Sequence, residues 1–426
     1  MWAVLGASLG MLTWARLPTM AQQTVWAEDG GIFLRDVLRH GHLQSIFLPY
    51  DGYLHIIPRT LVSLAHAVVP VQGYAVAISF LSCLAVAVIG LASFHLSRSV
   101  VEPLPARLMI AAIPVLLPVG PKEVLGNAAN LHWYLLWLMP WLLLHRPKSR
   151  AAGTVQFLAV LAVAASEIIT GMFLPLALWA VVRRRNFSAP AGLVLGLGLQ
   201  IVTTLVSPRI SDDVNYHPVD AMSVLLGFGL LPIGSTWQAD SRVLASTIIA
   251  HGAWALFIPC LLVLVLLVYT LIVGSRWLKV AAVGAVGASI VCWATSVLVS
   301  SRIMFSYSQY TEADWANGFG YMRYAAAPAM FLLLLLPLAV GAALEKNHLN
   351  RRASFAVAGM FVAFLLVSFF PASTARQAGP SWAAGVADAR AACEADAPPA
   401  SASVPVAPAG WKFAQVEIAC RELTSP

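Results

Sequence analysis

Long apolar stretches alternate with short polar ones along almost the whole chain. A bilayer core about 30 Å thick needs about 20 apolar residues for one helical crossing. Eleven stretches are expected to cross, several of them short: 1–20, 71–97, 107–119, 131–145, 152–166, 168–182, 189–206, 246–273, 280–299, 325–344 and 353–370. The pattern therefore predicts an all-α polytopic membrane protein with about 11 transmembrane helices.

The stretch 152–182 can be interpreted as one long tilted helix or as two short helices that meet near Glu167. The flanking segments 145–150 and 183–185 are both strongly basic. Basic loops lie on the cytoplasmic side of a membrane, so two crossings are needed between them. The charge pattern favours two helices.

Composition agrees with a membrane protein and excludes a water-soluble globule. Hydrophobic residues make up 59% of the chain and charged residues only 11%, whereas a soluble domain carries about 25% charged residues. The opening run 1–15 lacks the basic start of a signal peptide, so we expect a retained first helix. The net charge of +7 is spread in small clusters between apolar runs, which does not indicate a nucleic-acid partner.

The distribution of charge along the chain predicts its orientation. The expected inner loops contain Arg98, Arg107, Arg146, Lys148, Arg150, Arg183, Arg184, Arg185, Arg276, Lys279, Lys346, Arg351 and Arg352. The acids fall almost entirely in the alternate loops. This bias predicts a cytoplasmic N-terminus and an external C-terminus. The excess of Arg over Lys and the abundance of Ala favour a bacterial plasma membrane.

The long polar segments divide the chain into a membrane domain, 1–370, and a small external C-terminal tail, 371–426. The membrane domain is expected to carry its working loops on the outer face, because long loops are usually functional or disordered. These loops are 21–70, 120–130, 207–245 and 300–324.

The tail contains Cys393 and Cys420, which an oxidising compartment would allow to pair as a disulfide. Val416 and Ile418 alternate with Glu417 as in a strand. The alternative is a disordered tail rich in Ala and Pro, with two unpaired thiols.

The first external loop contains the segment WAEDGGIF, in which Glu28 and Asp29 are adjacent. The residues that follow, 32–40, have the apolar spacing of a short helix at the membrane surface. Asp29 could be only the N-cap of that helix, or it could be a functional carboxylate. The two glycines after Asp29 would let the backbone approach a substrate closely, so Asp29 is the preferred candidate for a catalytic base, with Glu28 as its neighbour or substitute.

Further along the same loop, LPYDGYLHIIPR contains Asp51, Tyr53, His55 and Arg59. Aromatic rings can stack on the CH faces of a sugar while polar groups bind its hydroxyls. A belt of aromatic residues at the membrane surface would also explain Tyr53, but it would not explain Asp51, His55 and Arg59.

Two more external segments carry candidate substrate-binding residues: Lys122, Glu123, Asn130, His132, Arg302, Arg323 and Tyr324. The polar residues of 121–137 could instead hold helices together. Arginine suits phosphate oxygens, although an arginine at a membrane surface can also simply extend into water. Glu167, between two apolar runs, is a further functional candidate, because ionisable groups near membrane depth are rarely incidental.

The chain contains neither a GxxxxGK[ST] motif nor a GxGxxG motif after a strand, and no HExxH or paired-cysteine metal motif. We therefore expect no nucleotide and no cofactor. Adjacent carboxylates leave a divalent metal ion possible, although two ligands are weak grounds for one.

The acidic pair in the first long external loop, followed by the short helix LRDVLRHG, resembles the GT-C superfamily of membrane glycosyltransferases. The resemblance implies an inverting transfer of a sugar, on the external face, from a polyprenyl-phosphate donor to a glycan or lipid acceptor of the cell envelope. Three alternatives remain open at this point: a transporter or flippase of lipid-linked saccharides, a polymerase or ligase of envelope glycans, and a structural membrane subunit.

Overall fold

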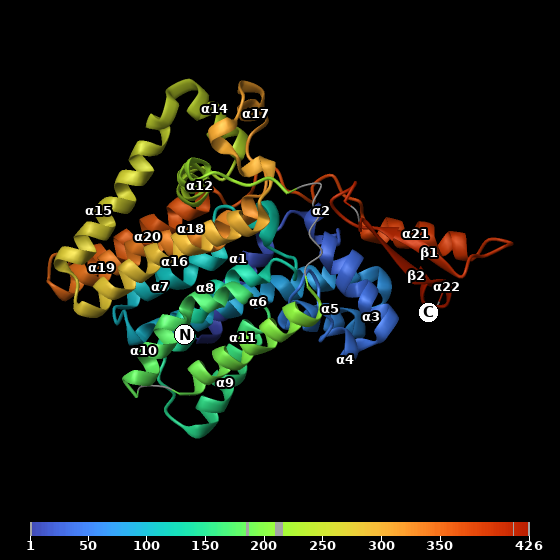
Figure 1. Cartoon of the computed structure of the whole chain (residues 1–426), viewed down its shortest axis with the longest axis horizontal. Coiled ribbons are helices and arrows are strands. Elements are labelled where there is room, and N and C mark those ends of the chain that lie inside the picture. Colours follow the sequence, from blue (N-terminus) through green and yellow to red (C-terminus); the bar gives the residue numbers. More distant parts are fainter. Residues whose placement is uncertain (1, 185–186, 209–215, 412, 425–426) are drawn as a thin grey trace.

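The computed structural model describes residues 2–184, 187–208, 216–411 and 413–424. Arg185 of the predicted inner loops and residues 209–215 of the predicted loop 207–245 lie outside this range. In the described part the protein is almost entirely helical, with a single two-stranded sheet near the C-terminus (Figure 1).

The helices of the membrane domain follow one another with short connections. They are α1 Trp2–Ala15, α2 Thr19–Gln22, α3 Arg35–His40, α4 His42–Ser45, α5 Ile56–Val68, α6 Tyr74–Leu96, α7 Leu104–Leu116, α8 Leu131–Leu144, α9 Arg150–Ala164, α10 Leu174–Val182, α11 Ser188–Val206, α12 Ala221–Phe228, α13 Gly234–Trp237, α14 Ser241–His251, α15 Phe257–Val273, α16 Arg276–Ser300, α17 Glu312–Asn317, α18 Ala326–Leu333, α19 Leu335–Glu345 and α20 Arg351–Val367. The tail adds α21 Trp382–Cys393, β1 Ser401–Pro405, β2 Gln415–Ala419 and α22 Cys420–Leu423.

Five helical spans among the described residues are long and apolar enough to cross a membrane: Val71–Ser99, Ser188–Val206, Trp254–Val273, Arg276–Ser300 and Met322–Glu345. Other predicted segments form apolar helices of 10–17 residues, such as Trp2–Ala15 and Leu131–Leu144. The structure thus supports a polytopic helical protein, and the predicted count of 11 crossings is not confirmed.

Two predicted segments test how well breaks in a helix can be located. The stretch 152–182 is divided as the basic flanks predicted: α9 ends at Ala164, and a new helical segment begins at Ile168. The prediction of one continuous helical segment over 246–273 is wrong. It is broken at Gly252, whose φ of +64° lies in a region that glycine adopts without steric cost.

The spans differ in how deeply they lie in the bundle. The span Met322–Glu345 is central, because 89% of its apolar segment is buried inside the protein. In the span Trp254–Val273, only 11% of the apolar segment is buried. Helix α18 packs against α8 and α16, and α15 lies at the periphery of the molecule (Figure 1). A helix whose apolar surface faces outward needs an apolar solvent, which a lipid bilayer supplies.

The segment 21–70, predicted as the first external loop, is more ordered than the sequence indicated. It folds into α2–α5 and a π-helical turn, Asp29–Leu34, that leads directly into α3. The predicted short helix over 32–40 is therefore present, but Ile32, Phe33 and Val37 are buried in the protein core and do not lie on a free surface.

The tail is a small folded unit and not a disordered extension. Strands β1 and β2 pair antiparallel, with Val404 opposite Val416, and the side chains of Val416 and Ile418 are fully buried. A disulfide joins Cys393 to Cys420, with 5.4 Å between their Cα atoms. The strand predicted around 416–418 is confirmed.

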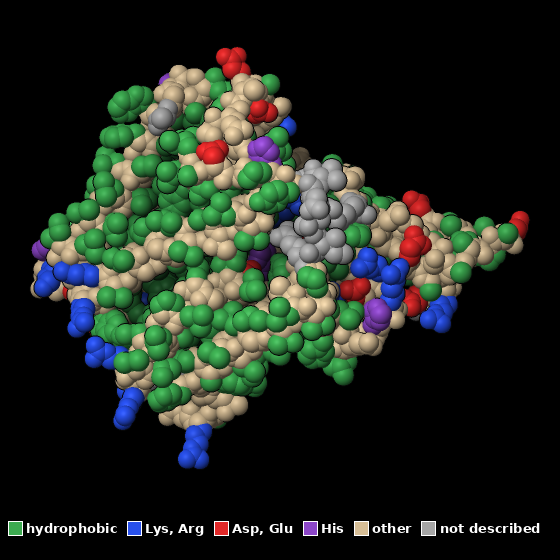
Figure 2. Space-filling model, in the orientation of Figure 1, with side chains coloured by type: hydrophobic (Ala, Val, Ile, Leu, Met, Phe, Trp, Pro, Cys, Tyr) green, Lys and Arg blue, Asp and Glu red, His purple; other side chains and the backbone are tan. Residues whose placement is uncertain are grey.

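Charged side chains are unevenly distributed over the molecule. In Figure 2, the lower left edge carries mainly Lys and Arg, the top carries mainly Asp and Glu, and the right side carries both kinds. This separation is the spatial counterpart of the charge bias along the sequence. The orientation of the chain in a membrane remains a prediction.

Candidate functional site

Glu28 lies at the start of the π-helical turn and is partly exposed as a residue. Burial raises the pKa of this carboxyl above its usual range, and the nearby Glu123 raises it further, while Arg323 and a hydrogen bond from the Trp26 side chain oppose the rise. A carboxyl with a raised pKa beside a cation is typical of a functional site.

Glu123 and Arg323 form an ion pair beside Glu28. The guanidinium of Arg323 contacts one oxygen of Glu123, and the Arg323 backbone N–H donates to the other oxygen at 3.1 Å. The side chain of Glu123 is 11% exposed and that of Arg323 is 25% exposed. A positive charge is therefore fixed next to Glu28 but is still accessible to a ligand.

A second arginine lies near the same position. The guanidinium of Arg302 is 5.7 Å from the centre of the Tyr321 ring, and that of Arg323 is 4.6 Å from it. Tyr321 has a φ of +53°, which is uncommon for a residue with a side chain and costs free energy. Two guanidinium groups gathered at one ring could bind a phosphate group.

Lys122 forms an ion pair with Asp240, with its Nζ 2.9 Å from the Asp240 carboxylate and 3.3 Å from Ser373 Oγ. Burial acts against ionisation of Asp240, but the hydrogen bond and charge of Lys122 lower its pKa overall. Lys122 and Glu123 thus link three segments: their own turn, the segment before α14 and the start of the tail.

Asp29 has a different environment from its neighbour. Its side chain is fully buried, and its two oxygens accept hydrogen bonds from the backbone N–H groups of Ala128 and Ala129, each at 2.8 Å. Burial raises the pKa of Asp29 to about 7, despite the opposing effect of these two hydrogen bonds. The N-cap interpretation of Asp29 is wrong, because its partners lie about 100 residues along the chain.

No protein-family model matches the chain, and no curated protein shows significant similarity to it.

The two glycines after Asp29 contact the tail. A Cβ atom on Gly30 would lie 2.5 Å from Cγ1 of Val406, and one on Gly31 would collide with the backbone oxygen of Phe413. The predicted reason for these glycines, close approach to a substrate, is therefore wrong. They let the tail pack directly on the turn that carries Glu28 and Asp29.

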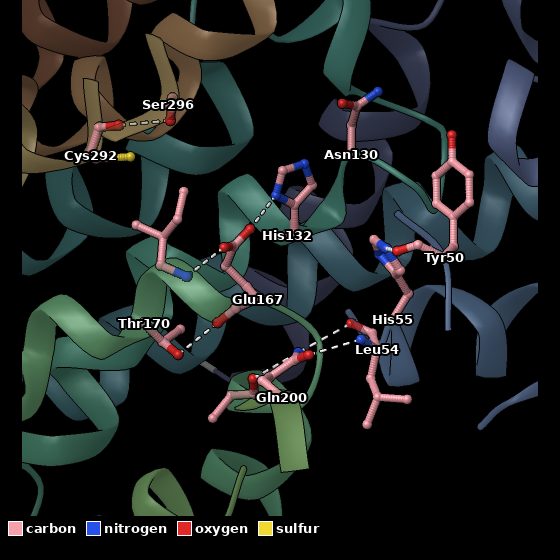
Figure 3. A network of polar contacts seen from close by, with 12 residues as sticks. Tyr50, Leu54, His55, Asn130, His132, Glu167, Thr170, Gln200, Cys292 and Ser296 are labelled. Atoms are coloured by element: carbon pink, nitrogen blue, oxygen red, sulfur yellow. Dashed lines mark hydrogen bonds and ion pairs between the residues drawn. The ribbon is translucent and has the colours of Figure 1, made fainter. Parts of the chain in front are cut away.

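A second polar cluster lies deeper in the bundle (Figure 3). His132 Nδ1 pairs with the carboxylate of Glu167, whose other oxygen accepts the backbone N–H of Ile169 at 2.7 Å. His55 packs on Tyr53 with ring centres 4.2 Å apart. Burial lowers the pKa of His55 well below its usual value, and the nearby charges of Arg59 and His132 act in the same direction.

The deeper cluster adjoins the Arg323 region through aromatic contacts. Trp133 lies 4.3 Å from the ring of His132 and 5.5 Å from that of Tyr324. His55 Nδ1 and Trp133 Nε1 are buried with no hydrogen-bond partner in the described structure. Figure 2 shows a hollow near the middle of one face, with histidine and acidic colours visible in its depth.

Two predicted binding residues lie beside the deeper cluster, each in different surroundings. Arg59 is 1% exposed and pairs with Asp36 at 2.9 Å, so it joins α5 to α3. Asp51 is exposed in the turn before Tyr53 and has a φ of +52°. Asn130 belongs to the loop that Asp29 holds, since its side chain donates to Asn127 Oδ1 at 2.9 Å.

Sequence reasoning missed four residues that build the site: Trp26, Asp240, Tyr321 and Arg376. Arg376 donates to the backbone oxygens of Leu125 and Gly126, and no motif distinguishes it from other basic residues of the tail. Glu167 was recognised as a candidate, but its pairing with His132 was not.

Within the described residues, no three His, Cys, Asp or Glu side chains are grouped as metal ligands. Glu28 and Glu123 are near one another, but the ion partner of Glu123 is Arg323. This donor set does not fit a divalent ion.

Proposed function

We propose that the protein is a membrane glycosyltransferase that moves a sugar from a polyprenyl-phosphate donor to a glycan or lipid acceptor of the cell envelope. The observation that carries this proposal is that Glu28, a partly exposed residue with a raised pKa, lies near the Arg323–Glu123 ion pair. Sugar transfer from a phosphate needs a base and fixed positive charge within one site, and both are present here.

In the proposed reaction, Glu28 takes the proton of an acceptor hydroxyl as that oxygen attacks the anomeric carbon. The bond between that carbon and the phosphate oxygen breaks, and its electron pair leaves with the polyprenyl phosphate. Arg323 and Arg302 stabilise the charge that develops on the phosphate. A single displacement of this kind inverts the anomeric centre.

Glu28 replaces Asp29 as the favoured base in this proposal. The side chain of Asp29 is fully buried and both of its oxygens accept backbone hydrogen bonds, so a substrate hydroxyl has no direct access to it. Glu28 is partly exposed and faces side chains that a ligand can approach. The predicted catalytic role of Asp29 becomes one of positioning.

The deeper cluster is suited to bind the sugar. Glu167 and His132 offer groups that bind hydroxyls, and Tyr53 and Trp133 offer rings that can stack on a sugar. The polyprenyl chain would remain in the bilayer. We place this reaction on the external face of a bacterial plasma membrane, in keeping with the charge bias of the sequence.

The test uses the purified full-length chain in lipid vesicles with a panel of polyprenyl-phosphate sugars and an extract of envelope glycans. Release of polyprenyl phosphate, together with a labelled glycan product of inverted configuration, would support the proposal. Complete absence of turnover across donors of every common hexose and pentose would contradict it.

A transporter of lipid-linked saccharides is the second candidate. Polar groups continue from His132 and Glu167 to Gln200, whose side chain contacts the backbone of Leu54 and Ala164 deep in the bundle (Figure 3). Such groups could line a path. Movement of a fluorescent lipid-linked sugar between leaflets, without turnover, would favour this candidate. A polymerase or ligase of preassembled glycans would use the same chemistry and would differ in the size of its donor.

A further inference from the structure

The loop 125–130 is held by two charged residues from distant parts of the chain. Asp29 accepts the backbone N–H groups of Ala128 and Ala129, each at 2.8 Å. The guanidinium of Arg376, from the tail, donates to the backbone oxygens of Leu125 at 2.7 Å and Gly126 at 3.0 Å. Backbone N–H groups of the loop 125–130 therefore donate to a carboxylate, and backbone oxygens of the same loop accept from a guanidinium.

Close packing leaves the loop little room to move. Gly126 has a φ of +75°, and a Cβ atom there would collide with the side chain of Leu17 and approach Arg376 to 3.0 Å. Within the loop, Asn127 donates to the Glu123 backbone oxygen at 2.8 Å and accepts from the Asn130 backbone N–H at 3.0 Å. Hydrogen bonds therefore hold the loop at several points along its length.

The two charged residues that hold the loop are both buried, at 0% exposure for Asp29 and 4% for Arg376. Each stabilises the charge of the other: Arg376 lowers the pKa of Asp29, and Asp29 opposes the fall in the pKa of Arg376 to about 10 that burial causes. A lone buried charge is costly, so the loss of either residue would leave the other uncompensated.

The loop connects groups that the proposed reaction uses. Glu123, which pairs with Arg323, precedes the loop, and His132, which pairs with Glu167, follows it. The tail also holds the residue before Glu123, because the Ala375 backbone N–H donates to the Lys122 oxygen at 2.9 Å. A shift of the loop would therefore displace the Arg323–Glu123 pair relative to Glu28.

We propose that Arg376 is a positioning residue, which clamps the loop 125–130 against Asp29 and so keeps Glu123 and Arg323 next to Glu28. This proposal rests on the proposed function for its consequence in catalysis, but the clamp itself can be tested without activity. It assigns the C-terminal tail a direct part in building the site.

The test compares Arg376→Lys with the wild-type chain in lipid nanodiscs. Lysine keeps the charge but cannot donate to both carbonyl oxygens in the fixed fork geometry of arginine. Hydrogen exchange of the backbone amides in residues 122–130 should become faster, those of Ala128 and Ala129 included. The matched control is Arg390→Lys, since Arg390 also lies in the tail and donates to a backbone oxygen, that of Leu423 at 2.6 Å.

Kinetics separate positioning from general stability. Small displacements at a reaction centre cost up to roughly 100-fold in rate, so kcat of Arg376→Lys should fall roughly 10- to 100-fold with little change in the KM for donor. Arg390→Lys should retain both the exchange pattern and kcat. Unchanged exchange over 122–130 in Arg376→Lys would overturn the clamp.

The remaining outcomes are also decisive. Faster exchange with an unchanged kcat would overturn the positioning role and leave a purely structural one. If the wild-type chain turns over no donor, the proposed function fails, while the exchange measurement still decides whether the clamp exists. If Arg376→Lys does not fold, Gly126→Ala serves as the second variant, because it disturbs the same contact and leaves both charges in place.

Discussion

Glu28 and Asp29 are neighbours in sequence, yet each lies near a different arginine, in a region built in a different way. Glu28 lies near Arg323, and both residues are partly exposed. Asp29 and Arg376 are buried, and both bind backbone atoms of one loop. The first region can exchange partners with a ligand, whereas the second has its hydrogen bonds already satisfied.

This difference shows why adjacency of two acids says little about their roles. A carboxylate that accepts two backbone N–H bonds fixes the geometry of a loop. A carboxylate with free capacity and a raised pKa can accept a proton near neutral pH. Under the proposed function, the two roles fall on consecutive residues at the start of one π-helical turn.

The largest expected effect comes from removing the charge of Glu28. Glu28→Gln should lower sugar transfer by roughly 10²- to 10⁴-fold, the usual contribution of a general base, and should leave hydrogen exchange over 122–130 unchanged. Turnover of the purified variant measures the first effect and exchange mass spectrometry the second.

Asp29→Asn is the companion variant that separates the two regions. An asparagine can accept only one of the two backbone N–H groups and presents its own N–H₂ to the other, which should cost about 1–3 kcal/mol of stability. We expect activity to fall together with faster exchange over 122–130. Near-normal turnover by Glu28→Gln, with loss only in Asp29→Asn, would reverse the assignment of the base to Asp29.

The next effect concerns the phosphate. Arg323→Gln should weaken binding of polyprenyl phosphate by about 1.5–3 kcal/mol, the worth of hydrogen bonds to a charged group. Fluorescence titration in nanodiscs measures this affinity. Arg35→Gln is a suitable control, because Arg35 pairs with Asp36 away from the site. Equal affinities for the wild-type chain and Arg323→Gln would remove Arg323 from the donor site.

A smaller effect is expected from opening the disulfide. Replacement of Cys393 and Cys420 by serine should destabilise the tail by about 3 kcal/mol in the chain-entropy treatment, for a sequence separation of 27 residues. Because the tail packs on Gly30 and Gly31, turnover should fall several-fold. Faster proteolysis of residues 393–420 would show the loosening, and resistance equal to that of the wild-type chain would contradict it.

The helical architecture was predictable because it depends on local pattern. Runs of apolar residues and the basic segments that separate them located most helices, including the division near Glu167. The break at Gly252 was missed, since a single glycine within an apolar run does not by itself distinguish a bend from a continuous helix.

The site was predictable only in part, because its partners are distant in sequence. Glu28, Glu123 and Arg323 were all singled out, but their grouping depends on contacts across up to 200 residues. The role of Arg376 was not predictable, since nothing in the tail indicates that it reaches the loop 125–130. The glycines after Asp29 were recognised as close-approach positions, but the sequence could not say what approaches them.

The smallest expected effect is a shift in pH dependence, and it tests whether Glu28 is the group that titrates. Burial raises the pKa of Glu28, Glu123 raises it further, and Arg323 and Trp26 lower it. A base must be ionised to act, so kcat should fall as pH drops through this raised pKa. Glu123→Gln removes a negative neighbour and frees Arg323 from its partner, and both changes stabilise the ionised form of Glu28. The acid limb of the profile should therefore move to lower pH, while the limb of Arg390→Lys should match that of the wild-type chain. A limb that moves to higher pH in Glu123→Gln would show that another group controls the rate.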